Sequence, residues 1–277
     1  MLYHHIQVKI NTKKNAPYFT GSMIRGSLGH ALKSTTCINP SFKCEGCFSA
    51  DSCLYYDFYE KQNIQHKYRL DIELKKNSFD FGFYLFSDAC IHLPYLLNSL
   101  KTALTENGLG RERETFTDIQ IKANGYIVYD DGSFDNKLDI EPQTIHTDCN
   151  SSKIKISLVT PLRIKKSNQL EYEKIQIEHI LRSIYQRKKL IFDNEEVYSL
   201  DYKPNYLAAV KTFEYKPLYR KSDRQDRKII MDGVLGEMAI IGLDKKSCNL
   251  LKIGEFIGAG KQTVFGMGKI KVEELNE

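Results

Sequence analysis

The first half of the chain alternates between strand-like and helix-like patterns of apolar residues. Residues 2–10, LYHHIQVKI, alternate apolar and polar side chains as a half-buried strand does, and a helical spacing of apolar residues follows. Two later strand-like runs are separated by a polar turn, which predicts a hairpin. The elements expected in this half are a strand at 2–10, a helix at 21–34, strands at 68–76 and 79–87, a helix from Pro94 to Gly108, and one long strand or a strand pair at 115–131.

The second half repeats this order without repeating the sequence. A strand is predicted first, a helix next, two long strands after it, and then a short helix and a last strand. The corresponding ranges are 153–165, 172–190, 205–220, 227–242, 249–257 and 269–275. The two halves therefore share the order of their elements and not their sequence.

Each half reads strand–helix–strand–strand–helix–strand, which is the ferredoxin-like arrangement. The sequence thus predicts an α+β protein of two tandem ferredoxin-like domains of the RNA-recognition type. Residues 130–152 are rich in turn formers and poor in apolar periodicity, and they are the expected boundary. We place an N-terminal domain at 1–150, with a cysteine-containing insertion at 37–57, and a C-terminal domain at 151–277, with a glycine-rich loop at 254–268.

Composition places the chain among globular proteins. Of its 277 residues, 42% are hydrophobic and 27% are charged, which excludes disordered and fibrous classes. No run approaches the ~20 apolar residues of a membrane span, and the N-terminus lacks the apolar core of a signal peptide, so we expect a cytoplasmic protein with no membrane partner. The net charge of +5 only mildly favours polyanions.

Four of the seven cysteines lie close together in the sequence, at Cys37, Cys44, Cys47 and Cys53. Four thiolates at this spacing can surround one tetrahedral zinc ion, and such a site would be structural because it leaves no position open for a substrate. The alternatives are a set of reduced thiols in a loop and an iron–sulfur cluster. The odd number and the clustering favour a reducing compartment over a disulfide framework.

The C-terminal stretch GEFIGAGKQTVFGMGK contains five glycines. It is not a nucleotide-binding phosphate loop, because Glu255 and Gln262 occupy positions where that motif needs Gly and Ser or Thr. Glycines allow a backbone to approach a polyanion closely, and two lysines add charge. The RNA-contact residues expected here are Gly258, Gly260, Lys261, Gly266, Gly268 and Lys269. A tight turn between helix and strand is the alternative.

A second basic segment lies at 216–228, with Tyr215 just before it and Tyr219 among its cations. A basic hairpin can follow the phosphates of RNA while tyrosines stack on unpaired bases. The residues predicted to do so are Tyr219, Arg220, Lys221, Arg224 and Arg227. Arg187, Lys188 and Lys189 extend this surface or simply form a solvated helix end.

Several stretches, in their order and spacing, resemble the repeat-associated (RAMP) proteins that process CRISPR precursor RNA. They are PYFTGSMIRGSLGHALKSTTC, CEGCFSADSCLYYDFYE, LVTPLRIKK, YRKSDRQDRKIIMDGVLGE and the terminal GAGKQTVFGMGK. The resemblance implies an endoribonuclease in which a 2′-hydroxyl attacks its neighbouring phosphate, leaving a 2′,3′-cyclic phosphate, with no cofactor for catalysis. Its implied partner is CRISPR repeat RNA in the precursor transcript.

The first helix offers acid–base groups for that reaction. Helical spacing leaves His30 and Lys33 on its polar face beside Gly26, and an imidazole can act as acid or base near neutrality. The catalytic histidine of the family often lies on or just after this helix, sometimes with Tyr and Lys. The predicted catalytic residues are His30, Lys33, Tyr55 and Tyr56, with Arg25 binding RNA; His66 is a reserve, and the alternative for His30 is an ordinary surface histidine.

Two other functions fit the same sequence. The first is a non-catalytic RAMP subunit that binds crRNA in an effector complex, whose other CRISPR proteins would then be partners. The second is a zinc protein that acts as a regulator or adaptor. Chemical turnover of repeat RNA distinguishes the enzyme from the first, and RNA affinity distinguishes it from the second.

Overall fold

A computed structural model of the chain describes residues 1–62, 64–135, 139–166, 169–222 and 227–275. The chain divides into two compact units. Unit 1 comprises Met1–Asp71 and Lys75–Thr144, and unit 2 comprises Ile72–Leu74 and Ile145–Glu277. Each unit has a sheet of its own with helices on one face, and the two are described separately below.

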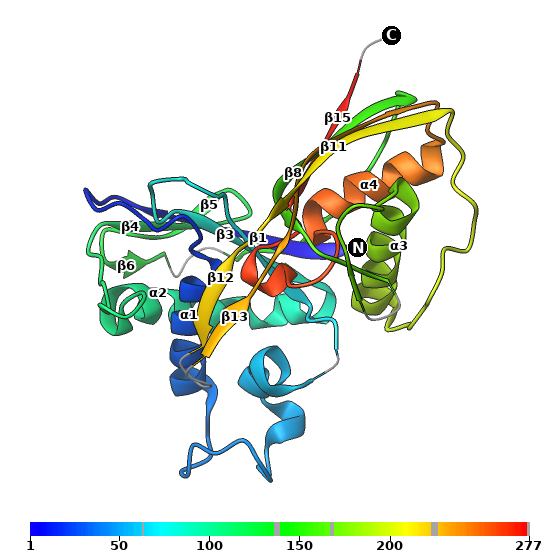
Figure 1. Cartoon of the computed structure of the whole chain (residues 1–277). Coiled ribbons are helices and arrows are strands. Elements are labelled where there is room, and N and C mark those ends of the chain that lie inside the picture. The colour runs from blue at the N-terminus through cyan, green and yellow to red at the C-terminus, as the bar shows by residue number, and fades with distance from the viewer. Residues whose placement is uncertain (63, 136–138, 167–168, 223–226, 276–277) are drawn as a thin grey trace. The chain divides into compact units, whose positions relative to one another are not determined.

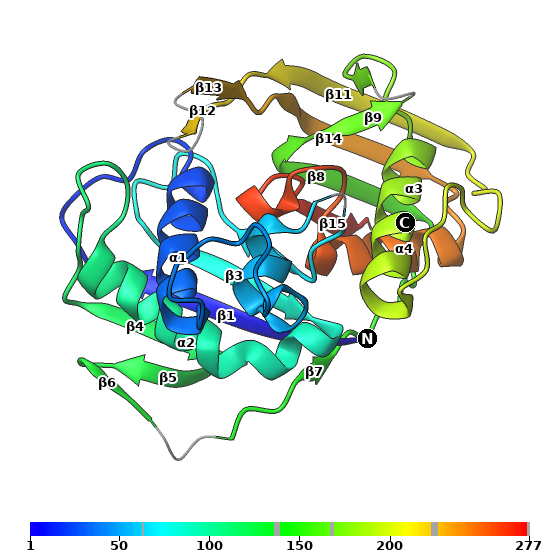
Figure 2. The ribbon, with the colours of Figure 1, turned by 90° about the horizontal axis from the view of Figure 1, so that it is seen from below.

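Unit 1 is an antiparallel sheet covered on one face by α1 and α2 (Figure 1, Figure 2). Alternation along β1 turns Ile6, Val8 and Ile10 into the core, where each is at most 4% exposed. The central strand order β2-β3-β1-β4 is that of a ferredoxin-like fold. The elements are β1 (Leu2–Ile10), α1 (Gly21–Thr36), β2 (Tyr68–Asp71), β3 (Phe81–Phe86), α2 (Leu93–Thr102), β4 (Ile119–Ala123), β5 (Tyr126–Asp130), β6 (Ser133–Phe134) and β7 (Gln143–Thr144).

Two details of unit 1 settle what the sequence left open. Residues 115–131 form the strand pair β4–β5 rather than one strand, because Asn124 and Gly125 both take positive φ in the turn between them. The helix that begins at Leu93 ends in a π-helical turn, Ala103–Asn107, and Gly108 stops it with a φ of 75°.

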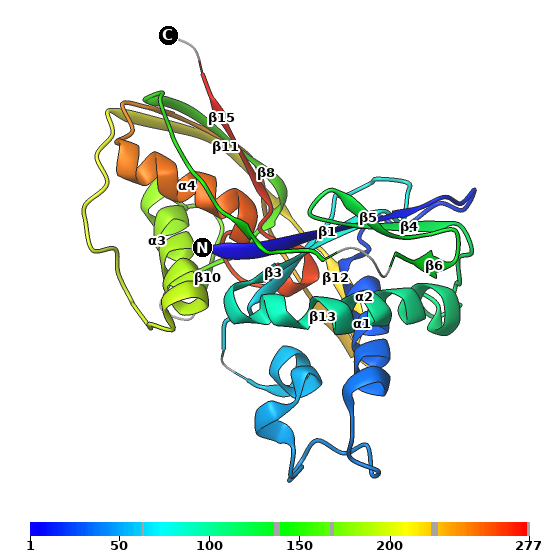
Figure 3. The same cartoon turned by 180° about the vertical axis from the view of Figure 1, so that it is seen from behind.

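Unit 2 has a four-stranded antiparallel sheet in the order β11-β14-β8-β15, with α3 and α4 packed on one face (Figure 3). This is again the ferredoxin-like order, which confirms the predicted α+β fold class. The elements are β8 (Lys153–Leu162), β9 (Ile164–Lys166), β10 (Gln169–Glu171), α3 (Ile177–Lys188), β11 (Ala208–Lys216), β12 (Tyr219–Ser222), β13 (Arg227–Ile230), β14 (Gly233–Ile241), α4 (Lys245–Ile257) and β15 (Ile270–Glu274).

Three boundaries in unit 2 differ from those predicted. The helix expected from Tyr172 begins at Ile177, because β10 occupies 169–171 and a Gln176–His179 capping box sets the start. The helix expected from Asn249 begins at Lys245, where the Asp244 carboxylate accepts the Ser247 N–H as an N-cap. Each predicted long strand is broken in two, so that β12 and β13 form a separate ribbon.

One cysteine pair contradicts the expectation of reduced thiols. Cys149, just before β8, and Cys248, in the first turns of α4, form a disulfide although 99 positions separate them. The sequence could not show this pair because only the packing of α4 beside β8 brings the two together. Within the described ranges, no helix combines the length and the apolar run that a bilayer crossing requires.

Short helical turns connect the main elements. They are η1 (Ala50–Ser52), η2 (Tyr56–Glu60) and η3 (Ser87–His92) in unit 1, and η5 (Lys189–Asp193) and η6 (Thr263–Phe265) in unit 2. Among these, η2 begins at one of the tyrosines predicted from the sequence, Tyr56, with the other, Tyr55, as its N-cap, and η6 lies inside the glycine-rich loop.

Candidate functional site

One face of α1 packs against η2 through a layer of aromatic rings. Arg25, Gly29 and Lys33 follow one another at four-residue spacing and so share this face. The Arg25 guanidinium lies 4.5 Å from the centroid of the Tyr59 ring, and the Lys33 ammonium lies 4.9 Å from that of Tyr55. The structure therefore brings together three of the residues predicted from the sequence, Arg25, Lys33 and Tyr55.

The aromatic layer is fixed by further contacts. Tyr55 and Tyr59 stack in parallel with ring centroids 5.3 Å apart, and the Tyr59 hydroxyl donates to the Arg25 carbonyl at 3.1 Å. Burial raises the pKa of Tyr59 well above its usual value. Gly29 makes the close packing possible, because a Cβ there would lie 2.6 Å from Cε1 of Tyr59. The absence of a side chain at Gly29 lets η2 lie directly on α1.

His30 lies on the exposed side of α1, together with Gly26. Both residues are exposed, and a Cβ built at Gly26 meets nothing within 4 Å. Among the described residues, no hydrogen bond or ion pair engages the His30 imidazole; only its backbone carbonyl is used, by the Ser34 hydroxyl. The structure thus leaves the His30 side chain exposed beside Gly26, one helical turn from Lys33, whose ammonium lies over the Tyr55 ring.

Tyr56 and His66 lie near the aromatic layer without joining it. Tyr56 is half-buried at the start of η2. Nδ1 of His66 is 3.1 Å from the Asp57 carbonyl oxygen, and the ring leans against Tyr68 with centroids 5.5 Å apart. Packing therefore accounts for His66, the reserve candidate.

The four clustered cysteines do not form the predicted zinc site. Within the described parts of the chain, no three His, Cys, Asp or Glu side chains are placed to hold one metal ion. Cys37, Cys44, Cys47 and Cys53 are all half-buried free thiols. The cysteines as placed are separate thiols, and zinc binding by this cluster stays a prediction.

The glycine-rich loop uses most of its N–H groups internally. Gly258, Gly266 and Gly268 are buried, and their N–H groups donate to the carbonyls of Gly254, Thr263 and Pro161. The Gly260 N–H donates to the Ser183 hydroxyl at 3.1 Å. These donors hold the fold together and are not directed at an outside phosphate.

Space, as well as hydrogen bonding, requires glycine in this loop. Gly268 has a φ of +69°, and a Cβ there would lie 1.8 Å from the Ala259 carbonyl oxygen. The exposed part of the loop is Lys261–Gln262. Contact between the loop and RNA stays a prediction, and these two residues are where the loop is open to it.

Positive charge gathers around Lys261. Partial burial, together with the charges of Lys165 and Arg187, lowers the pKa of Lys261 below its ordinary value. Its backbone N–H donates to the Arg163 carbonyl at 2.9 Å, which fixes the residue beside β9. Lys269, in contrast, is half-buried and its ammonium lies 3.6 Å from the Glu73 carboxylate. Lys261 is therefore the stronger anion-contact candidate of the two.

Arg187 has a role that the sequence did not reveal. It is 2% exposed, and its Nε donates to the Ile257 carbonyl at 2.6 Å, at the end of α4 where the glycine loop starts. The sequence suggested a surface residue beside Lys188 and Lys189. The signal that could have found it is spacing, because residue 187 continues the buried series Ile177, Ile180 and Ile184.

The basic ribbon β12–β13 is only partly described. Tyr219 is 52% exposed, and the Arg220 guanidinium lies 4.8 Å from the centroid of Phe265 in η6. Lys221 and Arg227 belong to β12 and β13, and Arg224 lies outside the described residues. The ribbon thus meets the glycine-rich loop through Arg220.

A buried carboxylate anchors the base of this ribbon. Asp232, between β13 and β14, is 8% exposed and receives hydrogen bonds from two tyrosine hydroxyls, Tyr172 at 2.7 Å and Tyr215 at 3.0 Å. Nη1 of Arg163 lies 2.9 Å from its other oxygen. Tyr215 and Arg163 therefore support the fold here, and fewer of the basic-segment side chains remain for RNA.

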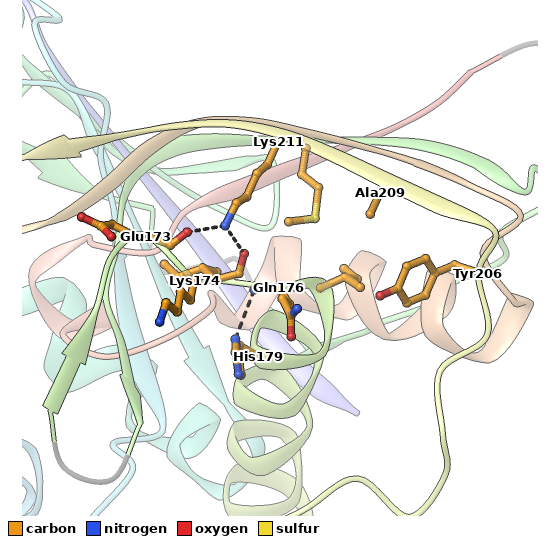
Figure 4. A pocket seen from close by; sticks show the side chains of 10 residues that line it. Glu173, Lys174, Gln176, His179, Tyr206, Ala209 and Lys211 are labelled. Carbon is orange, nitrogen blue, oxygen red and sulfur yellow. Dashed lines mark hydrogen bonds between the residues drawn. The ribbon is translucent and has the colours of Figure 1, made fainter.

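Unit 2 also has a pocket of about 510 Å³ between β11 and the start of α3 (Figure 4). The Lys211 ammonium projects into it and donates to the backbone carbonyls of Glu173 and Ile175. His179 points toward the backbone of Gln176, whose N–H its Nδ1 accepts at 3.1 Å. These polar groups hydrogen-bond to the backbone of the chain itself. The site residues predicted from the sequence do not line this pocket.

Each half of the chain matches the model of a known protein family. Residues 1–143, just over half of it, match the family model AF_1859_N, an N-terminal domain. Residues 156–270 match the model of the CRISPR-associated endoribonuclease Cas6. An uncharacterized protein of Archaeoglobus fulgidus is 26% identical over 278 residues, which cover 92% of each chain.

Solved structures share the fold along the whole chain. Cas6 of Thermus thermophilus in a product complex is 11% identical with a TM-score of 0.59, covering 98% of this chain and 99% of that one. A second Cas6 product complex is 10% identical with a TM-score of 0.55, covering 99% and 100%. A Cas6-related protein from Pyrococcus furiosus is 11% identical with a TM-score of 0.50, covering 99% of both.

The two matched domains follow the same order as the two compact units and confirm the resemblance found in the sequence. The chain belongs to the family with the AF_1859_N N-terminal domain, its second half matches the model of the CRISPR-associated endoribonuclease Cas6, and its whole length has the fold of the solved Cas6 structures.

Proposed function

We propose that the chain cuts CRISPR repeat RNA in the precursor transcript by acid–base catalysis without a metal ion. The 2′-oxygen forms a bond to the adjacent phosphorus while the bond from phosphorus to the 5′-oxygen breaks. A base takes the proton of the 2′-hydroxyl and an acid supplies one to the departing 5′-oxygen. The products are a 2′,3′-cyclic phosphate and a 5′-hydroxyl. The Cas6 domain supports the reaction class, and the exposed imidazole on α1 supports the mechanism.

His30 is the proposed acid or base. A group in this role must reach the reacting oxygen, and the open space beside Gly26 admits a ribose–phosphate unit to the His30 side of α1. Histidine suits the role because its ordinary pKa of about 6.5 lets it take up or release a proton near neutrality.

Lys33 and Tyr56 are proposed to stabilise the phosphorane, Tyr55 to hold the Lys33 ammonium with its ring, and Arg25 to hold a phosphate. Lys33 is the strongest of these because the Tyr55 ring fixes its ammonium. RNA binding is assigned to the exposed tip of the glycine-rich loop, at Lys261, and to the basic ribbon, at Tyr219 and Arg220, with Lys221, Arg224 and Arg227. The glycines act by shaping the loop.

Single-turnover cleavage of end-labelled repeat RNA in EDTA tests the proposal. His30→Ala should slow cleavage by ~10²- to 10⁴-fold with unchanged RNA affinity, as the loss of a true acid or base does. His146→Ala, at an exposed histidine outside α1, is the matched control and should cut at the wild-type rate. Wild-type speed in the His30 variant removes His30 from the mechanism, and cleavage that stops in EDTA removes metal independence.

The same assay separates the enzyme from a non-catalytic subunit. A defined cut with a cyclic-phosphate end identifies an endoribonuclease. Tight binding of repeat RNA by the wild-type chain with no cut identifies a scaffold that binds crRNA beside other effector proteins.

A further inference from the structure

Several strand ends of unit 2 meet at the buried carboxylate of Asp232. This residue lies in the short connection between β13 and β14. Its partners come from three other parts of the unit: Arg163 lies between β8 and β9, Tyr172 directly follows β10, and Tyr215 is near the end of β11. One side chain thus gathers segments that lie up to 69 positions apart in the sequence.

Both carboxylate oxygens of Asp232 accept hydrogen bonds. Oδ1 accepts from Nη1 of Arg163, and Oδ2 accepts from the hydroxyls of Tyr172 and Tyr215, whose rings meet edge to face with centroids 5.1 Å apart. Burial and the hydrogen bond to Asp232 raise the pKa of Tyr172, so its hydroxyl stays a donor at physiological pH. Hydrogen bonds to a charged acceptor are stronger than those between neutral groups, so the carboxylate fixes the direction of all three partners.

Arg163 connects this carboxylate to the glycine-rich loop. Its backbone carbonyl accepts the Lys261 N–H at 2.9 Å, and its Nη1 also donates to the Ile230 carbonyl, at the end of β13, at 3.3 Å. A Cβ on Gly260 would lie 2.5 Å from the carbonyl oxygen of Arg163, so the loop can lie this close only with glycine there. Arg163 therefore contacts the loop tip through its backbone and the ribbon through its side chain.

The ribbon β12–β13 depends on such side-chain contacts for its direction. In the part of the chain that the structure describes, its two strands pair with each other and not with the four-stranded sheet. A two-stranded hairpin is only marginally stable by itself in water. The Asp232 network holds the base of the ribbon, and the Arg220 guanidinium contacts the Phe265 ring of the loop farther along.

Removal of the Asp232 charge would affect both segments at once. A buried ion pair adds little net stability compared with apolar packing, but removing one partner leaves the other charge unpaired. Without the carboxylate, the Arg163 guanidinium and the two tyrosine hydroxyls lose the acceptor that they share. The ribbon and the loop tip would then no longer be held in one arrangement.

We propose that Asp232 is a positioning residue for RNA binding, because it holds the basic ribbon and the tip of the glycine-rich loop in a fixed relation to each other. It acts through Arg163 and the two tyrosines, and at 8% exposure it does not contact RNA itself. Side chains that are already in place lose less freedom when a ligand binds, and this raises affinity. The inference rests on the proposed function, which assigns RNA contact to the ribbon and to Lys261.

Fluorescence anisotropy with a labelled, unstructured oligouridylate tests the role of Asp232. Asp232→Asn keeps the size of the side chain but removes its charge and one acceptor oxygen. Affinity should fall roughly 5- to 30-fold, because the ribbon side chains must then be ordered on binding. Glu237→Gln, which breaks an ion pair with Lys155 elsewhere on β14, is the matched control and should bind as the wild type does.

A double-mutant cycle separates positioning from a general loss of structure. In the ribbon variant Tyr219→Ala/Lys221→Ala, the RNA contacts that Asp232 is proposed to position are already gone. Asp232→Asn should therefore cost clearly less affinity in that variant than in the wild type. A loss of the same factor in both proteins shows that Asp232 acts only on stability, and this outcome contradicts the proposal.

The hydroxyl donors provide a milder test in case Asp232→Asn does not fold. Tyr172→Phe/Tyr215→Phe keeps both rings and the Arg163–Asp232 ion pair, and it should bind the oligouridylate roughly 2- to 10-fold more weakly. Melting curves identify which variants are folded at the temperature of the binding assay. Wild-type affinity in every folded variant of the network overturns the proposal.

Single-turnover cleavage of repeat RNA distinguishes this inference from the proposed function. Variants of the Asp232 network should cut at the wild-type maximal rate but need more RNA to reach it. If the wild type binds and cuts RNA while the folded network variants bind as tightly as it does, the positioning role is wrong and the proposed function stands. If the wild type binds no RNA, both are wrong.

Discussion

The ammonium of Lys33 lies over the ring of Tyr55, 4.9 Å from its centroid, and this contact joins α1 to the segment that carries η2. The Tyr55 hydroxyl points elsewhere and donates to the Glu60 carboxylate at 3.0 Å. The ring of Tyr55 contacts Lys33 and its hydroxyl contacts Glu60, so different substitutions of Tyr55 test the two contacts separately.

Tyr55→Phe keeps the ring and should leave single-turnover cleavage near the wild-type rate. Tyr55→Ala removes the ring, so the Lys33 ammonium is no longer held in place to stabilise negative charge on the phosphorane. The cation–π contact is worth ~0.5–2 kcal/mol, so the rate should fall roughly 2- to 30-fold. A large loss in the Phe variant contradicts this and shows that the hydroxyl itself takes part in catalysis.

Two glycines of α1, three positions apart, should respond oppositely to alanine. Gly26→Ala adds a methyl group to open space and improves helix propensity, so it should stabilise the protein by up to ~1 kcal/mol. Gly29→Ala places a methyl group 2.6 Å from the Tyr59 ring and should therefore destabilise the protein. Thermal melting of both variants measures the difference, and equal melting temperatures contradict the packing of η2 on α1.

Breaking the Cys149–Cys248 disulfide should destabilise unit 2. The bond closes a loop of 99 residues and both sulfurs are buried, so its loss should cost about 2–4 kcal/mol. Melting of Cys149→Ser/Cys248→Ser against the wild type, each with and without reductant, measures this. The wild type should lose stability on reduction and the double variant should not. No difference between the oxidised proteins shows that the bond is absent in solution.

The N-cap of α4 should make stability depend on acid pH. Burial alone would raise the pKa of Asp244, but hydrogen bonds from the Asn205 and Ser247 N–H groups leave it below its usual value. A carboxyl group whose pKa is lower in the folded state stabilises the protein above its unfolded pKa of about 4 and loses that contribution as the pH falls further.

Asp244→Ala tests this through its difference from the wild type in chemical denaturation. At neutral pH the variant should be less stable by about 1 kcal/mol, the usual loss for an N-cap. The difference should shrink as the pH falls below about 4, where the wild-type carboxylate also becomes protonated. A difference that stays constant with pH contradicts the role of the charged carboxylate.

The sequence by itself determined the order of elements and the fold class. Local signals sufficed for this, because the alternation in β1 and the helical spacing in α1 each act through neighbouring residues. The motif order also identified the RAMP family. Boundaries shifted where a local cap competed with periodicity, as at Ile177 and Lys245.

Only the tertiary structure decided how residues distant in sequence share a surface. It put Lys33 against Tyr55 and left His30 in the open, it turned Arg187 inward to the end of α4, and it gathered Arg163, Tyr172 and Tyr215 around Asp232. The same packing joined Cys149 to Cys248. These outcomes depend on which faces of the elements meet, and that is set by long-range packing rather than by residue spacing.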